Sequence, residues 1–241
     1  IREYLCGEAM FALGITTTRA LCIVGSDAPV YRETVETSAV LTRLSPSHVR
    51  FGSFELFYYR GQHDRVRELA DYVIDQFYPE LMTAEDQYSA FLKEVMTRTA
   101  KLMAQWQSVG FCHGVMNTDN MSVLGLTIDY GPFGFLDEFD AAHICNHSDH
   151  AGRYAYNQQP NIGLWNLYCL AQTLVSLIEP EEIQKILVEY QSLFPQFYLE
   201  IMRTKLGFET ADDEVDGEVL SKMLGILHEN AVDYSQFMRR L

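Results

Sequence analysis

The sequence lacks any long apolar run. None of its 241 residues belongs to a stretch approaching the roughly 20 apolar residues that cross a bilayer, so we expect no membrane-spanning helix and no membrane partner. Hydrophobic residues still make up 48% and charged residues 21%, a globular composition that excludes a disordered chain. This length forms one large domain or two small ones.

Basic residues are scarce. Lys and Arg number 18 against 33 Asp and Glu, which gives a formal charge of -15. Such an acidic surface repels nucleic acid unless a local basic patch overrides it, so we expect no nucleic-acid partner.

The five cysteines show no paired spacing. The first residues also show no sign of a leader segment. The count is odd, the spacing is wide and no CxxC occurs among Cys6, Cys22, Cys112, Cys145 and Cys169. This argues against a disulfide scaffold and for a reducing compartment, which we take to be the cytoplasm. Residues 1–5 show no basic leader or cleavage site and read like the middle of a helix, which indicates a central piece of a longer protein.

The first 52 residues predict a small unit of one helix and at least two strands. Residues 1–14 have helical apolar spacing and a glycine stop. Residues 18–24 are rich in β-forming side chains and end at Gly25-Ser26-Asp27, and residues 39–44 predict a second strand.

Residues 53–241 predict a mainly helical unit interrupted by one long irregular stretch. The expected helices cover 54–60, 65–77, 85–109, 162–178, 180–194, 197–205 and 219–228, whereas 209–218, with six acids, predicts a solvated loop. One face of the 85–109 helix carries Tyr88, Leu92, Val95, Thr99, Leu102 and Trp106. Compact domains rarely keep some 50 non-periodic residues unless they carry function, which directs attention to 110–159.

Residues 113–129 hold the residue types of a metal–phosphate site. Asp119 and Asn120 precede a β-like run at 121–123, Leu124-Gly125 can turn the chain, and 126–128 can run back as a hairpin. Asp129 would then lie beside Asn120, and two such oxygen ligands suit Mg²⁺ or Mn²⁺ holding a nucleotide's phosphates. Asp119 remains free to accept a proton.

This order is the layout of a kinase active site, with a catalytic loop, a hairpin and an Asp-aromatic-Gly triplet at Asp129-Tyr130-Gly131. The alternative is that these acids only cap helices and turns. In the HRDxxxxN pattern of protein kinases the Asp and Asn are separated, whereas Asp119 and Asn120 are adjacent. The adjacency puts ordinary phosphoryl transfer to proteins in question.

At these residues the chain resembles the selenoprotein O family of kinase-like proteins, particularly its bacterial members. The resemblance covers essentially the whole chain through HGVMNTDNMSVLGLTIDYGPFGFLD, REYLCGEAMFALGITTTRAL, TRLSPSHVRFGSFE, ICNHSDHAGRYAYNQQP and YLEIMRTKLGF. It implies an α+β, protein-kinase-like fold with a partial small N-lobe (1–52) and a helical C-lobe (53–241). It also implies protein adenylylation, in which AMP moves from ATP to a Ser, Thr or Tyr hydroxyl of a protein and pyrophosphate leaves.

The resemblance also implies the site residues. Asp119 matches the catalytic acid residue, and Asn120 and Asp129 match the metal ligands. Arg43 and Arg50 match two arginines that hold the phosphates of an inverted nucleotide, a role that guanidinium groups suit chemically.

The resemblance leaves some of the family's parts outside this sequence. Glu3 matches the helix glutamate that pairs with a lysine, which the family carries upstream of residue 1. We therefore expect the 241 residues alone to bind ATP poorly and to be nearly inactive. The family's redox-active C-terminal residue would follow Leu241.

A dense patch after the triplet invites a zinc interpretation through His143, Cys145, His147, Asp149 and His150. No second ligand couple is apparent, so we favour the counterpart of a kinase activation segment. Cys145 could instead pair with the C-terminal cysteine that the family implies.

Four other features have simpler interpretations. His113 predicts a structural ring bonded to backbone. Arg153 and Tyr154 fit loop anchors or substrate contacts equally well. The aromatic residues Tyr58, Tyr59, Trp106 and Trp165 predict core packing, since no basic residues interleave with them.

Two rival functions stay open at this point. The same fold could transfer UMP or act as a γ-phosphoryl kinase. It could also be a nucleotide-binding pseudokinase that works as an interaction scaffold, because the kinase-type spacing of Asp and Asn is missing.

Overall fold

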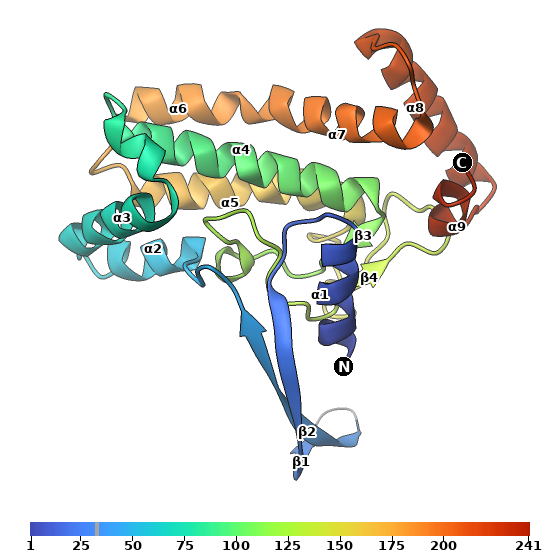
Figure 1. Ribbon diagram of the computed structural model, residues 1–241, viewed down its shortest axis with the longest axis horizontal. Coiled ribbons are helices and arrows are strands. Elements are labelled where there is room, and N and C mark those ends of the chain that lie inside the picture. The colour runs from blue at the N-terminus through green and yellow to red at the C-terminus, as the bar shows by residue number, and fades with distance from the viewer. Residues whose placement is uncertain (32–33) are drawn as a thin grey trace.

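A long antiparallel hairpin projects from a layered body of helices (Figure 1). The computed structural model describes residues 1–31 and 34–241. The N-terminal elements are α1 (Arg2–Ala12), β1 (Arg19–Tyr31) and β2 (Val35–Leu44). The remaining α-helices are α2 (Phe51–Tyr58), α3 (His63–Phe77), α4 (Gln87–Ser108), α5 (Gln159–Thr173), α6 (Pro180–Val188), α7 (Tyr190–Leu206), α8 (Asp213–Glu229) and α9 (Tyr234–Met238). Short strands β3 (Phe111–Cys112) and β4 (Gly134–Phe135) and the 3-10 turns η1 (Pro79–Thr83), η2 (Thr118–Asn120) and η3 (Tyr156–Gln158) complete the order.

The predicted mixture of helix and sheet is confirmed, but the hairpin is longer than the sequence indicated. The expected strand end at Gly25-Ser26-Asp27 is wrong, because β1 continues to Tyr31. Its pairing with β2 shifts register between Ser26 and Pro29, so the turn-forming residues make a bulge inside the strand. The predicted helix at 1–14 is confirmed, and Gly14 follows it with a φ of +74°.

The core is built around α4. Asp86 caps this helix by accepting hydrogen bonds from the Tyr88 and Ser89 amides, which fixes where it begins. The helix packs against α5, α6 and α7, and Figure 1 shows these four helices as stacked rods. The predicted apolar face is confirmed at Leu92, Val95, Thr99, Leu102 and Trp106, which are buried. Tyr88 is half-buried at the edge of the core.

Two helix boundaries differ from the sequence expectation. The break expected near Pro195 is wrong, because α6 ends and α7 begins at Glu189, and Pro195 lies within α7. Burial of Tyr190, whose hydroxyl donates to the Pro160 carbonyl, holds this region as helix despite the proline. The solvated loop expected at 209–218 is also wrong in its second half, since α8 begins at Asp213.

That start of α8 has a local cause. The Asp212 side chain accepts a hydrogen bond from the Val215 amide, and the Asp216 carboxylate pairs with Arg203 at 2.5 Å. Asp212 and Asp216 therefore stabilise the first turn of α8 instead of being fully solvated.

Candidate functional site

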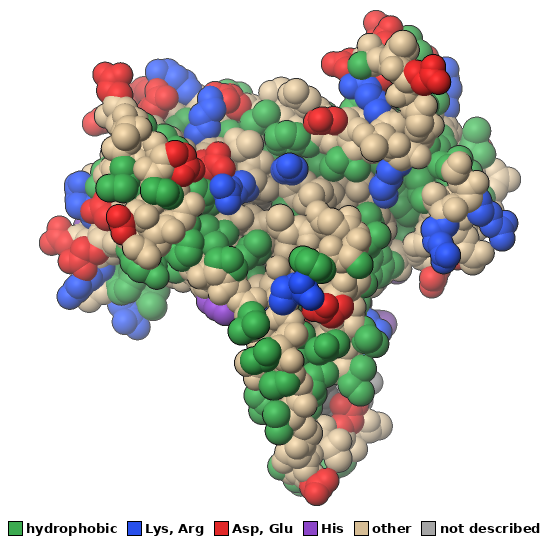
Figure 2. Space-filling view, in the orientation of Figure 1, with side chains coloured by type: hydrophobic (Ala, Val, Ile, Leu, Met, Phe, Trp, Pro, Cys, Tyr) green, Lys and Arg blue, Asp and Glu red, His purple; other side chains and the backbone are tan. Residues whose placement is uncertain are grey.

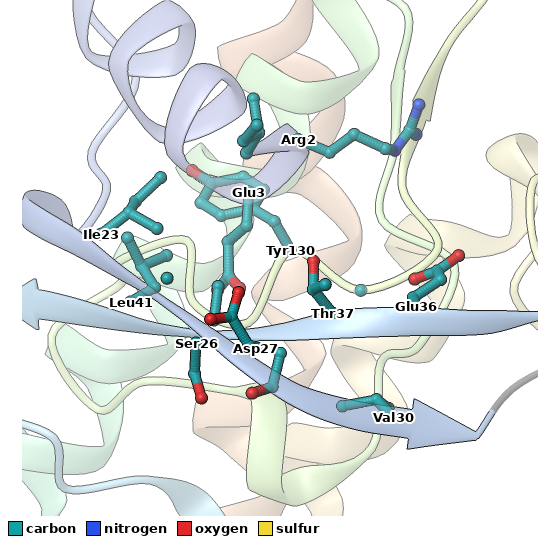
Figure 3. Close-up of a pocket in the computed structure, with 15 residues that line it drawn as sticks. Arg2, Glu3, Ile23, Ser26, Asp27, Val30, Glu36, Thr37, Leu41 and Tyr130 are labelled. Carbon is teal, nitrogen blue, oxygen red and sulfur yellow. The ribbon is translucent and has the colours of Figure 1, made fainter.

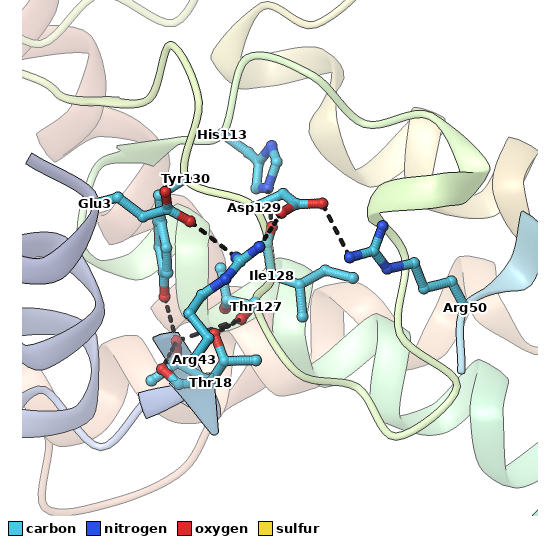
Figure 4. Close-up of polar contacts among 10 residues, drawn as sticks. Glu3, Thr18, Arg43, Arg50, His113, Thr127, Ile128, Asp129 and Tyr130 are labelled. Carbon is cyan, nitrogen blue, oxygen red and sulfur yellow. Dashed lines mark hydrogen bonds and ion pairs between the residues drawn. The ribbon is translucent and has the colours of Figure 1, made fainter. Parts of the chain in front are cut away.

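Charged side chains from distant parts of the chain converge on Asp129 (Figure 4). Arg43 at the end of β2 pairs with one carboxylate oxygen of Asp129, and Arg50 Nη2 lies 3.3 Å from the other. Arg43 Nη1 also lies 2.9 Å from the Glu3 carboxylate on α1. Four predicted site residues thus form one half-buried network with two positive and two negative groups.

The positive charge of Arg43 is shared between two carboxylates. Arg43 Nη1 lies 2.9 Å from the Glu3 carboxylate, although the geometry of that ion pair does not make it a hydrogen bond. The other end of the guanidinium pairs with Asp129. An oxyanion could replace one of these carboxylates, so the network has capacity for an anionic ligand.

Buried hydrogen bonds hold the backbone just before Asp129. We call the residues that make them, Trp106, His113, Thr127 and Ile128, the buried polar column. The Ile128 carbonyl accepts a hydrogen bond of 2.8 Å from His113 Nε2, and the Thr127 hydroxyl accepts one of 2.9 Å from Trp106 Nε1. His113 stacks on Trp106 and is fully buried, and this burial lowers the pKa of the imidazole. The prediction that His113 is structural is confirmed.

Asp129 itself adopts an unusual backbone conformation. Its φ is +59°, a left-handed geometry that few non-glycine residues adopt. Strain of this kind persists where the surroundings over-determine it and is common at functional sites. The buried column behind Ile128 and the two arginines in front of Asp129 supply that constraint.

Asn120 presents an oxygen from the end of η2. Its Nδ2 donates to the Val115 carbonyl at 2.9 Å, which assigns the amide and leaves Oδ1 without a hydrogen-bond partner within the described ranges. The next residue is tied to α2, because the Phe51 amide donates to the Met121 carbonyl at 2.9 Å. Asn120 is therefore fixed close to the chain that carries Arg50.

Asp119 lies against the first turn of α2. Its Oδ1 occupies the space where a β-carbon on Gly52 would stand, only 2.1 Å from that position. The neighbouring Thr118 hydroxyl donates to Glu55 on the same helix. The absence of a side chain at Gly52 thus lets the Asp119 carboxylate approach the helix N-terminus, which favours its negative charge.

The hairpin predicted across 121–128 is wrong. A turn is present, since the Gly125 amide donates to the Ser122 carbonyl at 3.1 Å, but its two arms do not pair. Ser122 bridges to Arg50, and Thr127 bridges in parallel to Thr17. Each arm finds its backbone partners in the N-terminal unit, which satisfies the groups that a local hairpin would otherwise use.

Glu3 contacts Arg43, and the pair with a lysine that the resemblance implies stays a prediction. The sequence predicted an ion pair with an upstream lysine, and in this structure the carboxylate faces Arg43. Arg43 in turn contacts carboxylates, whereas the sequence assigned it to phosphate oxygens. A guanidinium held by two carboxylates is positioned but can exchange one of them for another oxyanion.

A cleft of about 990 Å³ opens beside the network, between the start of α1, the hairpin and Tyr130-Gly131 (Figure 3). Glu3 lines this cleft, so the charged network borders it. Sequence reasoning missed Thr17, whose hydroxyl is hydrogen-bonded to the hydroxyl of Tyr130, a residue that lines the cleft. The only available signal was the aromatic position of the Asp129-Tyr130-Gly131 triplet.

The patch at 143–150 does not assemble a metal site. In the part of the chain that the structure describes, no three His, Cys, Asp or Glu side chains gather around one point. Asp149 instead accepts hydrogen bonds from the Arg153 and Tyr154 amides, so it orders the loop. Cys145 lies beside Cys112, with 3.3 Å between their sulfur atoms.

The core interpretation of the aromatic residues is right for Trp106 and wrong for two others. Trp106 is buried, but Tyr59 is 67% exposed and Trp165 is 45% exposed. The Arg153 guanidinium lies 4.5 Å from the Trp165 ring centroid, so Arg153 anchors the loop to this ring. Tyr58 is half-buried against the core.

No helix in the described residues is long and apolar enough to cross a membrane.

Comparison with known proteins places these observations in a family. A family model described as "Protein adenylyltransferase SelO" matches residues 1–241. The chain is 58% identical over 241 residues to a protein of Thiobacillus denitrificans and 57% identical over 241 residues to one of Myxococcus xanthus, both named "Protein nucleotidyltransferase YdiU". Both alignments cover 100% of this chain and 49% of the relative, so the chain spans about half the length of the curated relatives it matches.

Proposed function

The chain belongs to the SelO family, and on that premise we propose that it carries the catalytic centre of a protein adenylyltransferase. In this reaction AMP moves from ATP to a Ser, Thr or Tyr hydroxyl of a protein, and pyrophosphate leaves. The observation that carries the proposal is the convergence of Arg43 and Arg50 on Asp129, with Glu3 paired to Arg43 on its other side.

Arg43 and Arg50 would bind the phosphates of ATP. Both guanidinium groups are half-buried, where charge-assisted hydrogen bonds are stronger than in water. They can hold phosphate oxygens and neutralise the charge that develops on the departing pyrophosphate. Glu3 keeps Arg43 oriented during that exchange of partners.

Asn120 and Asp129 fit a divalent cation. Their amide and carboxylate oxygens are the hard ligands that Mg²⁺ or Mn²⁺ prefers, and Asn120 Oδ1 is left available by the bond that holds its Nδ2. Few protein ligands are needed, since Mg²⁺ usually completes its coordination with phosphates and water. When bound, such an ion supplies positive charge to the phosphate oxygens.

Asp119 would act on the protein hydroxyl group that accepts AMP. Its carboxylate is placed against α2 by the open space at Gly52, which orients one oxygen. From there it accepts the proton or fixes the direction of the attacking hydroxyl, which is the general-base role.

We also propose the kinase-like division of the chain that the sequence suggests. Residues 1–52 would belong to an N-lobe, because they form a helix and a hairpin, and residues 53–241 to a C-lobe, because they are mainly helical. The charged network joins α1 and β2 to the loop before β4, so the site lies at the junction of the two parts (Figure 4).

The test is transfer by the full-length protein. The protein is incubated with a protein acceptor, Mg²⁺ or Mn²⁺, and ATP labelled at either the α- or the γ-phosphate. Adenylylation transfers only the α-label. Transfer of the γ-label identifies a kinase. A parallel incubation with α-labelled UTP completes the test, and faster transfer from UTP than from ATP identifies a UMP transferase.

The scaffold alternative predicts no transfer of either label. It also predicts that an Asp129→Ala variant loses nucleotide binding but keeps the biological effect, whereas a transferase loses both.

A further inference from the structure

An exposed face of α2 and α5 adjoins the candidate site on the side of Asp119. The two helices pack against each other, and both contact η2, the turn that carries Asp119 (Figure 1). The Thr118 hydroxyl, one position before Asp119, donates to Glu55 on α2. The helices α2 and α5 therefore flank the residue that would act on an acceptor hydroxyl.

Two exposed aromatic side chains and an arginine gather on this face around Cys169. Burial raises the pKa of the Cys169 thiol, the charge of Glu55 adds to the rise and the charge of Arg153 opposes it, so both charged groups lie close to the thiol. Trp165 lies one helical turn before Cys169 on α5, and Tyr59 follows directly after α2. Partial loss of solvent raises the pKa of the Tyr59 hydroxyl, and its neighbours Glu55 and Cys169 add to this effect. We call Tyr59, Arg153, Trp165 and Cys169 the aromatic surface.

Arg153 is held in an orientation that suits a carboxylate ligand. Its guanidinium carbon lies 4.5 Å from the Trp165 ring centroid and 5.7 Å from that of Tyr154, and its backbone amide donates to Asp149 at 2.9 Å. It takes part in no ion pair within the described ranges, although the chain carries 33 acidic residues. A guanidinium stacked on a ring keeps the N–H groups at its edge free, where they can bind both oxygens of a carboxylate.

The composition of the aromatic surface is that of a protein-binding site. Tyr, Trp and Arg are the residue types that contribute most of the binding free energy at the centres of protein interfaces. Single exposed aromatic residues need no explanation, but Tyr59 and Trp165 meet around one half-buried thiol beside a candidate catalytic group. Arg153 also lines an open groove of about 450 Å³ with Ile144 and Asn157, along which a bound chain could continue.

We propose that the aromatic surface binds the protein acceptor, and that Arg153 pairs with an Asp or Glu side chain of the acceptor close to the hydroxyl that receives AMP. The inference rests on the proposed function, since it places that hydroxyl at Asp119. Tyr59 and Trp165 would cover apolar side chains of the acceptor. The charge of -15 disfavours acidic partners at long range, so the preference for a carboxylate comes from this local pair.

The experiment compares the binding of two fluorescein-labelled peptide libraries to the full-length protein by fluorescence anisotropy, at about 150 mM salt. Every peptide has a central Ser, Thr or Tyr with about five residues on each side, which span roughly 17 Å when extended. Asp is the only charged residue type in one library, and Lys is the only one in the other. The measured quantity is the ratio of the affinities for the Asp and Lys libraries, which cancels any general loss of binding.

Reversal of one charge should change this ratio. Arg153→Glu should lower it by at least about tenfold, because an attraction for Asp becomes a repulsion and the opposite holds for Lys. Arg239→Glu is the matched control, since it makes the same change of net charge at the exposed end of α9 and should leave the ratio unchanged. An unchanged ratio in Arg153→Glu, or an equal fall in Arg239→Glu, would overturn the inference.

Trp165 provides the second test. Trp165→Ala should weaken the binding of both libraries by at least about fivefold, whereas Trp165→Phe should keep most of the affinity. Wild-type affinity in Trp165→Ala would overturn the inference. So would a concentration-dependent dimer in sedimentation that Trp165→Ala abolishes while neither library binds, because a second copy of the chain would then be the occupant.

Transfer of the α-label of ATP to the same peptides separates this inference from the proposed function. The transfer rates should follow the same preference for Asp or Lys as the binding does. No α-label on either library or on the protein itself would remove the proposed function, and the acceptor role of the aromatic surface with it. Transfer at equal rates by the wild type, Arg153→Glu and Trp165→Ala would overturn the inference alone.

Discussion

Replacing Gly52 by alanine should disable the candidate site while leaving the fold intact. The new β-carbon would stand 2.1 Å from Asp119 Oδ1 and 3.1 Å from its Cγ, whereas ordinary contacts begin at 3.4 Å. The Asp119 carboxylate must therefore move by about 1.3 Å. Misplacing a catalytic group by about 1 Å costs roughly 100-fold in rate, or about 2.7 kcal/mol in transition-state stabilisation.

The stability of the folded protein, unlike its activity, should hardly change. Alanine is favoured over glycine within a helix by up to about 1 kcal/mol, and the clash involves the end of a side chain that can rotate. We expect the melting temperature of Gly52→Ala to stay within about 3 °C of the wild type. The KM for ATP should hardly change, because Arg43, Arg50 and Asp129 are untouched.

The assay measures initial rates of α-label transfer by the full-length protein over a range of ATP concentrations. Gly217→Ala is the matched control, since Gly217 also lies in a helix and has open space around its β-carbon position. Folded Gly52→Ala protein with a wild-type kcat would refute the reasoning that the reaction uses Asp119 in this position.

Three further predictions test the network and the column behind it. Arg43→Ala should weaken ATP binding by at least about tenfold in a fluorescence titration. Arg19→Ala, which removes a partly exposed pair with Glu8 and a stacking contact with Phe11 outside the network, should not. Equal effects of the two substitutions would contradict the phosphate assignment. Asp129→Asn should abolish Mn²⁺ binding measured by electron paramagnetic resonance in the presence of ATP, and unchanged affinity would remove Asp129 from the ligands. Burial lowers the pKa of His113 in the folded protein. As the pH falls below about 6.5, the imidazole therefore binds a proton in the unfolded chain before it does so in the folded one. The free energy of unfolding should then fall by up to about 1.4 kcal/mol per pH unit. His113→Phe should show a shallower acid dependence in urea unfolding, and an identical slope would show that another group causes the loss.

The helical part of the fold followed from local pattern, and its errors have identifiable causes. The stripe on α4 predicted the buried face because burial follows helical spacing over a long segment. Pro195 failed as a boundary because packing of Tyr190 outweighs the cost of one proline in a helix. At Gly25-Ser26-Asp27 the turn signal became a bulge, since β2 offered a partner strand that local sequence cannot reveal.

Part of the candidate site could likewise be predicted from the sequence, and part could not. Residue type and order were enough to select Asp129, whereas Arg43, Arg50 and Glu3 were selected through the family resemblance. The structure brings these four side chains into one network. The roles of all these residues, and of Asp119 and Asn120, stay predictions. What could not be predicted were partners far along the chain. The arms around Gly125 bind Arg50 and Thr17 instead of each other, a pairing that depends on tertiary structure.

Those two backbone bridges also determine how the site responds to movement of the hairpin. They join the base of the β1–β2 hairpin to both sides of the Gly125 turn, next to the residues that lead to Asn120 and Asp129. A rigid swing of the hairpin pivots about its base, and points on a pivot axis travel least. A displacement of the hairpin about this base would therefore leave the backbone near Asn120 and Asp129, the proposed metal ligands, almost where it is.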